Sequence, residues 1–331
     1  MNSKMDRWRG ARAGAVLFAA ALLAACGGGN SQVSAFSPNR IVAFGDETSV
    51  IDDFKGDANG RKYTVNATVS ATDPTLDCRL NPLWIQTLSA HYGLVFPQCN
   101  PAPTAVAAPT SRIRAMPGAR VADLPAQIDA QQAETPFTTR DLVTVLIGEN
   151  DILAQYTQYP AVPETTLITN LQAAGTAIGD QVNRLSATGA RVLVSTVPDV
   201  GLTPYANSER AAHTDTDRAA LLRRLTKALN DKMRAQITND GHLIGLLLTD
   251  EYIQTIAAFP GTGGFTNATT GVCDLTRSAL VPPSVLDCTK LTLISGGSST
   301  AYLWADATHL SAGGQLSLGS LAVNRAVNNP F

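Results

Sequence analysis

Three short stretches of the sequence carry side chains that can do chemistry. Residues 45–49 (Gly-Asp-Glu-Thr-Ser) and residues 148–151 (Gly-Glu-Asn-Asp) each follow an apolar run, and residues 306–309 (Asp-Ala-Thr-His) precede the last segment. His309 is a candidate general base, and Asp306 is placed to orient its ring. Ligands of α/β proteins bind where the chain leaves the carboxyl ends of strands, so we expect these stretches to converge on one site.

Together these stretches resemble the SGNH/GDSL family of ester hydrolases, over roughly residues 40–325. The family's Asp-x-x-His motif falls on Asp306 and His309, and its Gly-x-Asn-Asp block falls on residues 148–151. The resemblance implies that the amide of Asn150 and the backbone N–H of Gly118 form the oxyanion hole. It also implies a three-layer, flavodoxin-like α/β fold with a central parallel sheet of about five strands.

The sequence departs from the family pattern at the nucleophile. The family's Gly-Asp-Ser reads Gly45-Asp46-Glu47, so Glu47 occupies the position of the catalytic serine. A carboxylate that attacked an ester would form a high-energy anhydride, and we expect Glu47 to pair with protonated His309 instead. Thr48 and Ser49 are possible substitute nucleophiles, but either would require the turn to shift by one residue.

The remaining pattern alternates between strand and helix, which is typical of an α/β fold with a parallel sheet. A loose alternation at residues 60–69 suggests a hairpin, and residues 261–297 form a long Gly/Thr/Ser-rich segment. Ser311 is a candidate N-cap for the last helix. We expect strands at residues 41–44, 111–116, 142–147, 191–197 and 242–248, and helices at residues 83–94, 121–132, 165–187 and 208–238.

The N-terminus predicts export and lipid attachment. Four basic residues precede an apolar run at residues 13–25, and Leu23-Ala24-Ala25-Cys26 resembles the bacterial lipobox. We therefore expect a signal peptide at residues 1–25, and lipidated Cys26 with a flexible tether at residues 26–39. A single SGNH/GDSL-type domain at residues 40–331, with inserted loops near 52–82 and 261–297, would follow. An ordinary signal peptide with an incidental cysteine is the alternative.

The charge balance does not favour nucleic acid as a partner. The 331 residues carry a formal net charge of −2, and the chain without residues 1–25 retains 21 basic and 26 acidic residues, a charge of −5. We expect a protein of the bacterial cell envelope that meets the membrane through its lipid only. The expected location is the outer membrane, facing the periplasm or the exterior.

Four further cysteines, Cys78, Cys99, Cys273 and Cys288, predict disulfides in an exported protein. Three pairings are open, and we favour the local one, Cys78–Cys99 with Cys273–Cys288. Zinc is the competing ligand, but the sequence has no Cys-x-x-Cys pair.

Two functions remain open at this point. The first is hydrolysis of acyl or acetyl esters, by a displaced hydroxyl or by water that Glu47 or His309 activates. The second is a pseudo-esterase that binds an acyl ester, an acetylated glycan or a protein partner without cleaving it. We expect no cofactor and no metal, although Asp46, Glu47, Asp306 and His309 include acceptable metal-ligand types.

Overall fold

The computed structural model describes residues 36–70 and 73–328, and the chain from Ser37 onward forms one compact unit. Its centre is a five-stranded parallel sheet with the strand order β4-β1-β5-β6-β7. By position in the main sheet this is the order 2-1-3-4-5, which is the flavodoxin-like order, so the expected fold is confirmed. The strands are β1 (Arg40–Gly45), β4 (Arg112–Ile113), β5 (Asp141–Leu146), β6 (Arg191–Ser195) and β7 (Ile244–Leu247).

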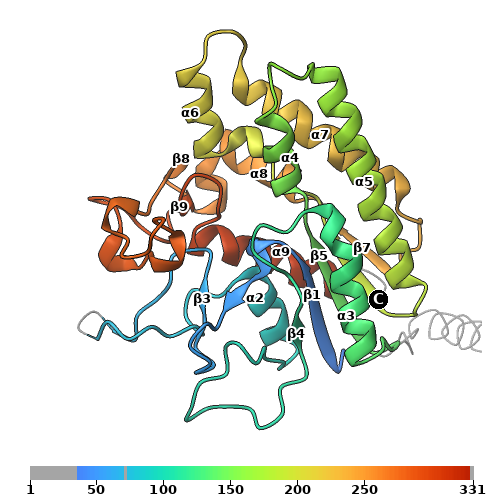
Figure 1. Cartoon of the computed structure of the whole chain (residues 1–331). Coiled ribbons are helices and arrows are strands. Elements are labelled where there is room, and N and C mark those ends of the chain that lie inside the picture. Colours follow the sequence, from blue (N-terminus) through green and yellow to red (C-terminus); the bar gives the residue numbers. More distant parts are fainter. Residues whose placement is uncertain (1–35, 71–72, 329–331) are drawn as a thin grey trace, which may run out of the picture. The chain divides into compact units, whose positions relative to one another are not determined.

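Helices cover the sheet on both faces because its strands are apolar on both faces (Figure 1). Alternate residues of β1, β5 and β6, such as Val42, Val143 and Val192, join one core with α3, α5 and α7. Helices α2 and α9 pack on each other, and α9 also contacts β7. The helices are α2 (Trp84–His91), α3 (Leu124–Glu134), α4 (Glu149–Tyr156), α5 (Glu164–Ser186), α6 (Pro204–Ala212), α7 (Arg218–Gln236), α8 (Thr249–Ala258) and α9 (Ala312–Asn328).

One expected helix is two helices. The prediction of a single helix at residues 208–238 is wrong, because α6 ends at Ala212 and α7 begins at Arg218. Asp217 caps α7 by accepting a hydrogen bond from the backbone N–H of Ala220 at 3.0 Å. An aspartate at this position favours a new helix start over a continuous helix. The expected cap of α9 is confirmed, since Ser311 Oγ accepts from the N–H of Gly314.

Each inserted segment contributes a strand to a small two-stranded sheet. The prediction of a hairpin within residues 60–69 is wrong, because β3 (Arg61–Lys62) pairs with β2 (Ile51–Asp52) from the preceding segment. The long segment before the last motif contains β8 (Asn267–Gly271), which pairs in parallel with β9 (Tyr302–Trp304). The pairing of β8 with β9 brings this segment beside the residues that carry His309.

The disulfides follow the local pairing. Cys78 is bonded to Cys99 and Cys273 to Cys288, so the favoured connectivity is confirmed. Closing loops of this size stabilises a fold by roughly 3 kcal/mol in the chain-entropy model.

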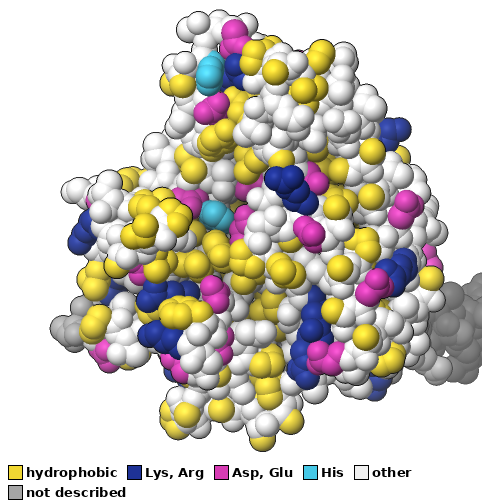
Figure 2. Space-filling model, viewed as in Figure 1, with side chains coloured by type: hydrophobic (Ala, Val, Ile, Leu, Met, Phe, Trp, Pro, Cys, Tyr) yellow, Lys and Arg dark blue, Asp and Glu magenta, His cyan; other side chains and the backbone are white. Residues whose placement is uncertain are grey.

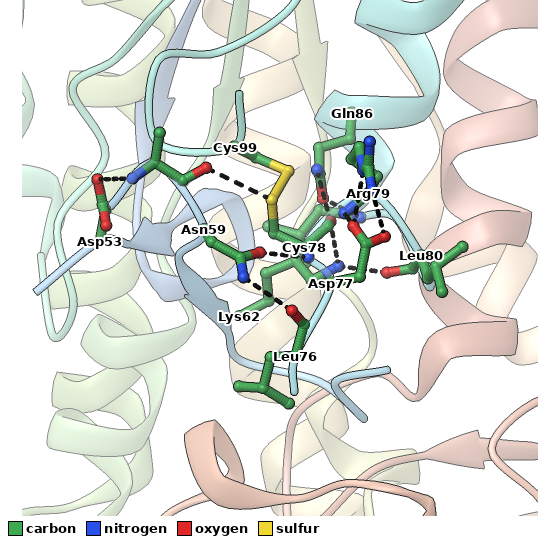
Figure 3. Close-up of a disulfide and its surroundings, with 12 residues drawn as sticks. Asp53, Asn59, Lys62, Leu76, Asp77, Cys78, Arg79, Leu80, Gln86 and Cys99 are labelled. Carbon is green, nitrogen blue, oxygen red and sulfur yellow. Dashed lines mark hydrogen bonds and ion pairs between the residues drawn. A yellow bond between two sulfur atoms is a disulfide. The ribbon is translucent and has the colours of Figure 1, made fainter. Parts of the chain in front are cut away.

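A buried lysine lies beside the first disulfide. Figure 3 shows Lys62 directed at the backbone of the cysteine-bearing loop. The Nζ of Lys62 donates to the carbonyls of Cys78, Leu80 and Asn81 at 2.6–2.8 Å. Its side chain is completely buried. The lysine and the disulfide therefore hold the first inserted segment against the start of α2.

Candidate active site

The Asp306–His309 pair is formed as the sequence predicts. His309 Nδ1 lies 2.8 Å and 2.9 Å from the two carboxylate oxygens of Asp306. Asp306 Oδ1 also accepts the backbone N–H groups of Thr308 and His309, which fixes the turn. The hydrogen bond from the N–H of Ala305 to the carbonyl of His309 closes this turn. The Nε2 atom of His309 is buried and has no hydrogen-bond partner in the part of the chain that the structure describes.

Glu47 lies between this pair and the residues that the family resemblance assigns to the oxyanion hole. Its Oε2 accepts a hydrogen bond from the N–H of Gly118 at 2.8 Å and one from Asn150 Nδ2 at 3.0 Å. Its Oε1 lies 3.9 Å from His309 Nε2, an ion-pair distance too long for a hydrogen bond. Glu47, His309, Gly118 and Asn150 are therefore brought together, and the carboxylate binds both donors that the resemblance assigns to the oxyanion hole.

The turn that carries Glu47 has a defined geometry. Gly45 has a φ of +135°, and a Cβ at this position would lie 1.8 Å from the carbonyl oxygen of Leu146, so only glycine fits. Asp46 then caps the short 3-10 turn Glu47–Ser49 by accepting the N–H of Thr48 at 3.1 Å. This cap directs the chain sharply away from β1 and leaves Glu47 at the carboxyl edge of the sheet.

Gln127 of α3 supports this turn, and the sequence reading did not single it out. Its amide accepts from the N–H of Gly45 and donates to the carbonyl of Gly45, both at 2.9 Å. Asp151 has a similar role for the second block, because its Oδ2 accepts the N–H of Val121 just after Gly118. A polar residue inside an apolar helix face is the only sequence signal that could have indicated Gln127.

The substitute nucleophiles are not at the histidine. Ser49 is fully buried, and its Oγ accepts a hydrogen bond from the indole N–H of Trp84 at 3.1 Å. Thr48 is partly buried, and among the described residues neither hydroxyl is hydrogen-bonded to His309. Ser49 thus has a structural role, and Thr48 remains the one hydroxyl of the pair with access to solvent.

Acidic groups surround the imidazole of His309. Burial disfavours its charge, but Asp306, Glu149 and Glu47 outweigh burial and raise the pKa of His309 to about 9. The histidine is therefore protonated at neutral pH. Burial and the neighbouring Glu47 raise the pKa of Glu149 to about 7, against the influence of His309. Burial, Glu47 and Glu149 also raise the pKa of Asp46 well above its ordinary range.

Tyr63 is a second residue that the sequence did not indicate. Its ring lies against the imidazole of His309, with centroids 5.5 Å apart and planes tilted by 32°. It follows β3 directly, so the first inserted segment supplies one wall of the site. An aromatic face near a protonated imidazole stabilises the cation.

The raised pKa predicts how stability depends on pH. A base whose pKa rises from 6.5 to about 9 on folding stabilises the fold fully below pH 6.5. That stabilisation, roughly 3 kcal/mol, is lost as the pH rises through 9. Burial lowers the pKa of Lys62 to about 7, which gives an opposite slope, so wild type must be compared with His309→Gln at each pH.

The measurement is urea unfolding across this range, together with NMR titration of the His309 imidazole. The free energy of unfolding of wild type should exceed that of His309→Gln by less and less between pH 6.5 and pH 9.5. A histidine that titrates near its ordinary value would contradict the ion-pair cluster.

Cys26 and the lipobox lie outside the described residues. Within residues 36–70 and 73–328, no helix is long and apolar enough to cross a membrane. In the same ranges no group of three or more His, Cys, Asp or Glu residues could hold a metal ion.

The fold and the site define an α/β protein with the framework of a serine-type ester hydrolase. The sequence matches the family model described as "GDSL-like Lipase/Acylhydrolase" over residues 41–321, so the chain belongs to this family. No curated protein sequence matches the chain.

Several solved structures are similar to this one. An acetyl xylan esterase, AlAXEase, is 10% identical with a TM-score of 0.43, and the match covers 85% of this chain and 96% of that one. Axe2, an acetylxylan esterase from Geobacillus stearothermophilus, is 12% identical with a TM-score of 0.41, over 89% of this chain and 97% of that one. A member of the lipolytic G-D-S-L family from Veillonella parvula is 11% identical with a TM-score of 0.38, over 86% and 96% of the two chains.

Proposed function

We propose that this protein is a non-hydrolysing member of the GDSL family that binds a ligand at the bacterial cell envelope. One observation carries the proposal. Glu47 Oε2 accepts hydrogen bonds from both Gly118 and Asn150, the two donors that would stabilise an ester oxyanion. An oxyanion needs such donors within about 2.7–3.1 Å, and here the protein's own carboxylate has taken them.

The charge of His309 supports the same conclusion. A general base must be unprotonated to accept a proton, and the pKa of His309 is raised to about 9. At neutral pH the imidazolium is paired with Asp306 and lies near Glu47. The serine nucleophile is replaced, the oxyanion donors are occupied and the base is charged, so three parts of the serine mechanism are disabled together.

The family indicates the class of ligand. A lipase/acylhydrolase scaffold fits an acyl ester or an acetylated glycan. Such a ligand would meet the rim of the site at Tyr63, Thr48 and the exposed side chain of Met116. On the face shown in Figure 2, acidic, basic and hydrophobic side chains are interspersed.

The test separates binding from turnover. Addition of an acetylated oligosaccharide should shift the imidazole resonance of His309 without release of acetate. Short-chain nitrophenyl esters should be hydrolysed no faster by wild type than by His309→Ala. Acetate release by wild type above the His309→Ala background would contradict the proposal, and an unchanged imidazole resonance would exclude this ligand class.

A second candidate is residual hydrolysis through Thr48 or through water activated at Glu47. The observation that favours it is that His309 Nε2 has no hydrogen-bond partner within residues 36–70 and 73–328. Oxyanion stabilisation and binding alone can retain some rate after loss of a triad member. A fluorophosphonate probe distinguishes the candidates, because labelling of wild type at Thr48 would establish a displaced nucleophile.

Lipid attachment at Cys26 is part of the proposal, on the evidence of the lipobox and the glycine-rich segment after it. Wild-type protein should partition into the detergent phase of a Triton X-114 extraction, and Cys26→Ala should remain in the aqueous phase. Two or more acyl chains make anchoring stable, so the expected change is close to complete. Equal partitioning of the two proteins would disprove anchoring through this residue.

A further inference from the structure

A second crevice lies at the same edge of the sheet as the candidate active site. The active site is built where β1 and β5 end, whereas this crevice lies beyond the ends of β6 and β7, between α7 and α8. We call it the α7–α8 groove; it has a volume of about 630 Å³, and Asp199, Arg223, Arg234, Asp250, Gln254 and Phe259 are among its lining residues. Its volume lies within the roughly 300–1,000 Å³ of small-molecule sites.

The two buried carboxylates of the groove have their charge satisfied within the protein. Asp199 accepts from Arg223 Nε at 3.2 Å and from Gln254 Nε2 at 2.9 Å. Asp250 accepts from Arg234 Nη2 at 2.7 Å and from Thr196 Oγ1 at 2.8 Å. These carboxylates are therefore not available as counter-ions for a cationic ligand or a metal.

The charges nearer the rim are paired as well. Lys227 forms an ion pair with Asp231, and Arg234 also reaches Glu251. The lining has four acidic and three basic groups, all of them in ion pairs, so the groove keeps one formal negative charge and does not attract a simple anion. The groove can still form hydrogen bonds with a ligand, through the atoms of Arg223 and Gln254 that do not bind Asp199. Arg223 is half-exposed and donates to Asp199 through Nε, and Gln254 donates through Nε2.

One wall of the groove is apolar and open. Phe259, directly after α8, lines the groove and is 65% exposed. A pyranose ring has a C–H face that packs on an aromatic ring and a rim of hydroxyls that bind carboxylate, amide and guanidinium groups. An aromatic side chain beside ion-paired polar groups is complementary to that combination.

We infer that the α7–α8 groove is a binding site for a neutral oligosaccharide, separate from the GDSL site. Phe259 packs on one sugar ring, and Arg223 and Gln254 bind its hydroxyls. The carboxylates that line the groove are held in ion pairs, and the role inferred for the site is binding of a glycan without cleavage. This inference does not depend on whether Glu47 prevents ester hydrolysis at the GDSL site.

The test uses xylotetraose, cellotetraose and chitotriose, none of which carries the O-acetyl ester of the proposed active-site ligand. We expect at least one to bind in calorimetry and to shift the amide resonances of residues 250–259. Phe259→Ala should weaken this binding about tenfold or more, and Phe259→Tyr, which keeps an aromatic face, should retain it. Phe54→Ala removes a similarly exposed phenylalanine elsewhere and should have no effect.

Three results would overturn the inference. One is that none of the three oligosaccharides binds to the full-length protein. Another is that binding survives Phe259→Ala. The third is that the resonances that shift belong to the active-site residues and the binding is lost in Asn150→Ala. Because Phe259 is exposed, its variants are expected to fold as wild type does, so a loss of binding reports on the groove itself.

Discussion

Glu47→Ser is expected to give the protein a measurable esterase activity. The substitution returns a hydroxyl to the family's nucleophile position and removes the carboxylate from Gly118 and Asn150, so both donors become available to an oxyanion. It also removes one of the acidic groups that raise the pKa of His309, which favours the neutral imidazole needed by a general base. One substitution thus repairs the nucleophile, the oxyanion hole and the base together.

The controls assign the gain to this machinery. Glu47→Ala vacates the oxyanion hole without adding a nucleophile and should show neither fluorophosphonate labelling nor burst kinetics. Adding Asn150→Ala to Glu47→Ser should lower the rate about a hundredfold or more, the cost of losing an oxyanion donor in a serine hydrolase. The rate of Glu47→Ser should rise with pH as His309 loses its proton.

The measurements are hydrolysis of nitrophenyl acetate and labelling by a fluorophosphonate, read by mass spectrometry at residue 47. A folded Glu47→Ser protein that neither hydrolyses nor labels would show that the site has diverged beyond one residue. Thr48 and Gln127, which flank or support the turn, would then be the next positions to examine.

Lys62→Met is expected to destabilise the fold measurably. Methionine retains most of the buried stem, but the carbonyls of Leu80 and Asn81 lose the hydrogen bonds from Nζ. The carbonyl of Cys78 keeps a hydrogen bond from Gln86 Nε2 at 3.1 Å. A buried carbonyl left without a partner costs about 1–3 kcal/mol, and because these two carbonyls are only partly buried we expect a total loss of ~2 kcal/mol.

The measurement is urea unfolding near pH 6. Burial lowers the pKa of Lys62 to about 7, so below this pH the ammonium group carries all three protons for its three acceptors. Lys227→Met is the matched control, because Lys227 is 73% exposed and its ion pair with Asp231 is worth less than about 1 kcal/mol. Equal stability of the two variants would mean that Lys62 contributes only its apolar stem.

Local sequence patterns were sufficient to predict features formed by residues that are close in the sequence. Strands β1, β5 and β6 are largely apolar runs that are buried on both faces, so their composition alone marks them as parallel strands, whereas β4 is only partly buried. Asp306 and His309 are three residues apart, and the aspartate binds both the ring and the backbone of that same turn. The disulfides each join cysteines close in sequence, which made the local pairing the natural choice.

The secondary-structure predictions for residues 208–238 and 60–69 were wrong because a short local feature interrupts a longer hydrophobic pattern. Asp217 ends the apparent helix at residues 208–238 by starting a new one, and an N-cap is worth only about 1 kcal/mol against a long helical run. The β2–β3 pairing in the first inserted segment joins residues on either side of a turn that composition does not specify. Neither feature changes the hydrophobic periodicity from which helices and strands were predicted.

The sequence by itself predicted the family, the parallel α/β framework and the Asp306–His309 pair, and it has Glu47 at the position that the family resemblance assigns to the serine nucleophile. Only the tertiary structure decided what Glu47 does. Its partners Gly118 and Asn150 lie 71 and 103 residues away, and their donors meet one carboxylate oxygen because β1 and β5 are neighbours in the sheet. No pattern within a segment encodes such a contact, since it depends on where separate strands end in space.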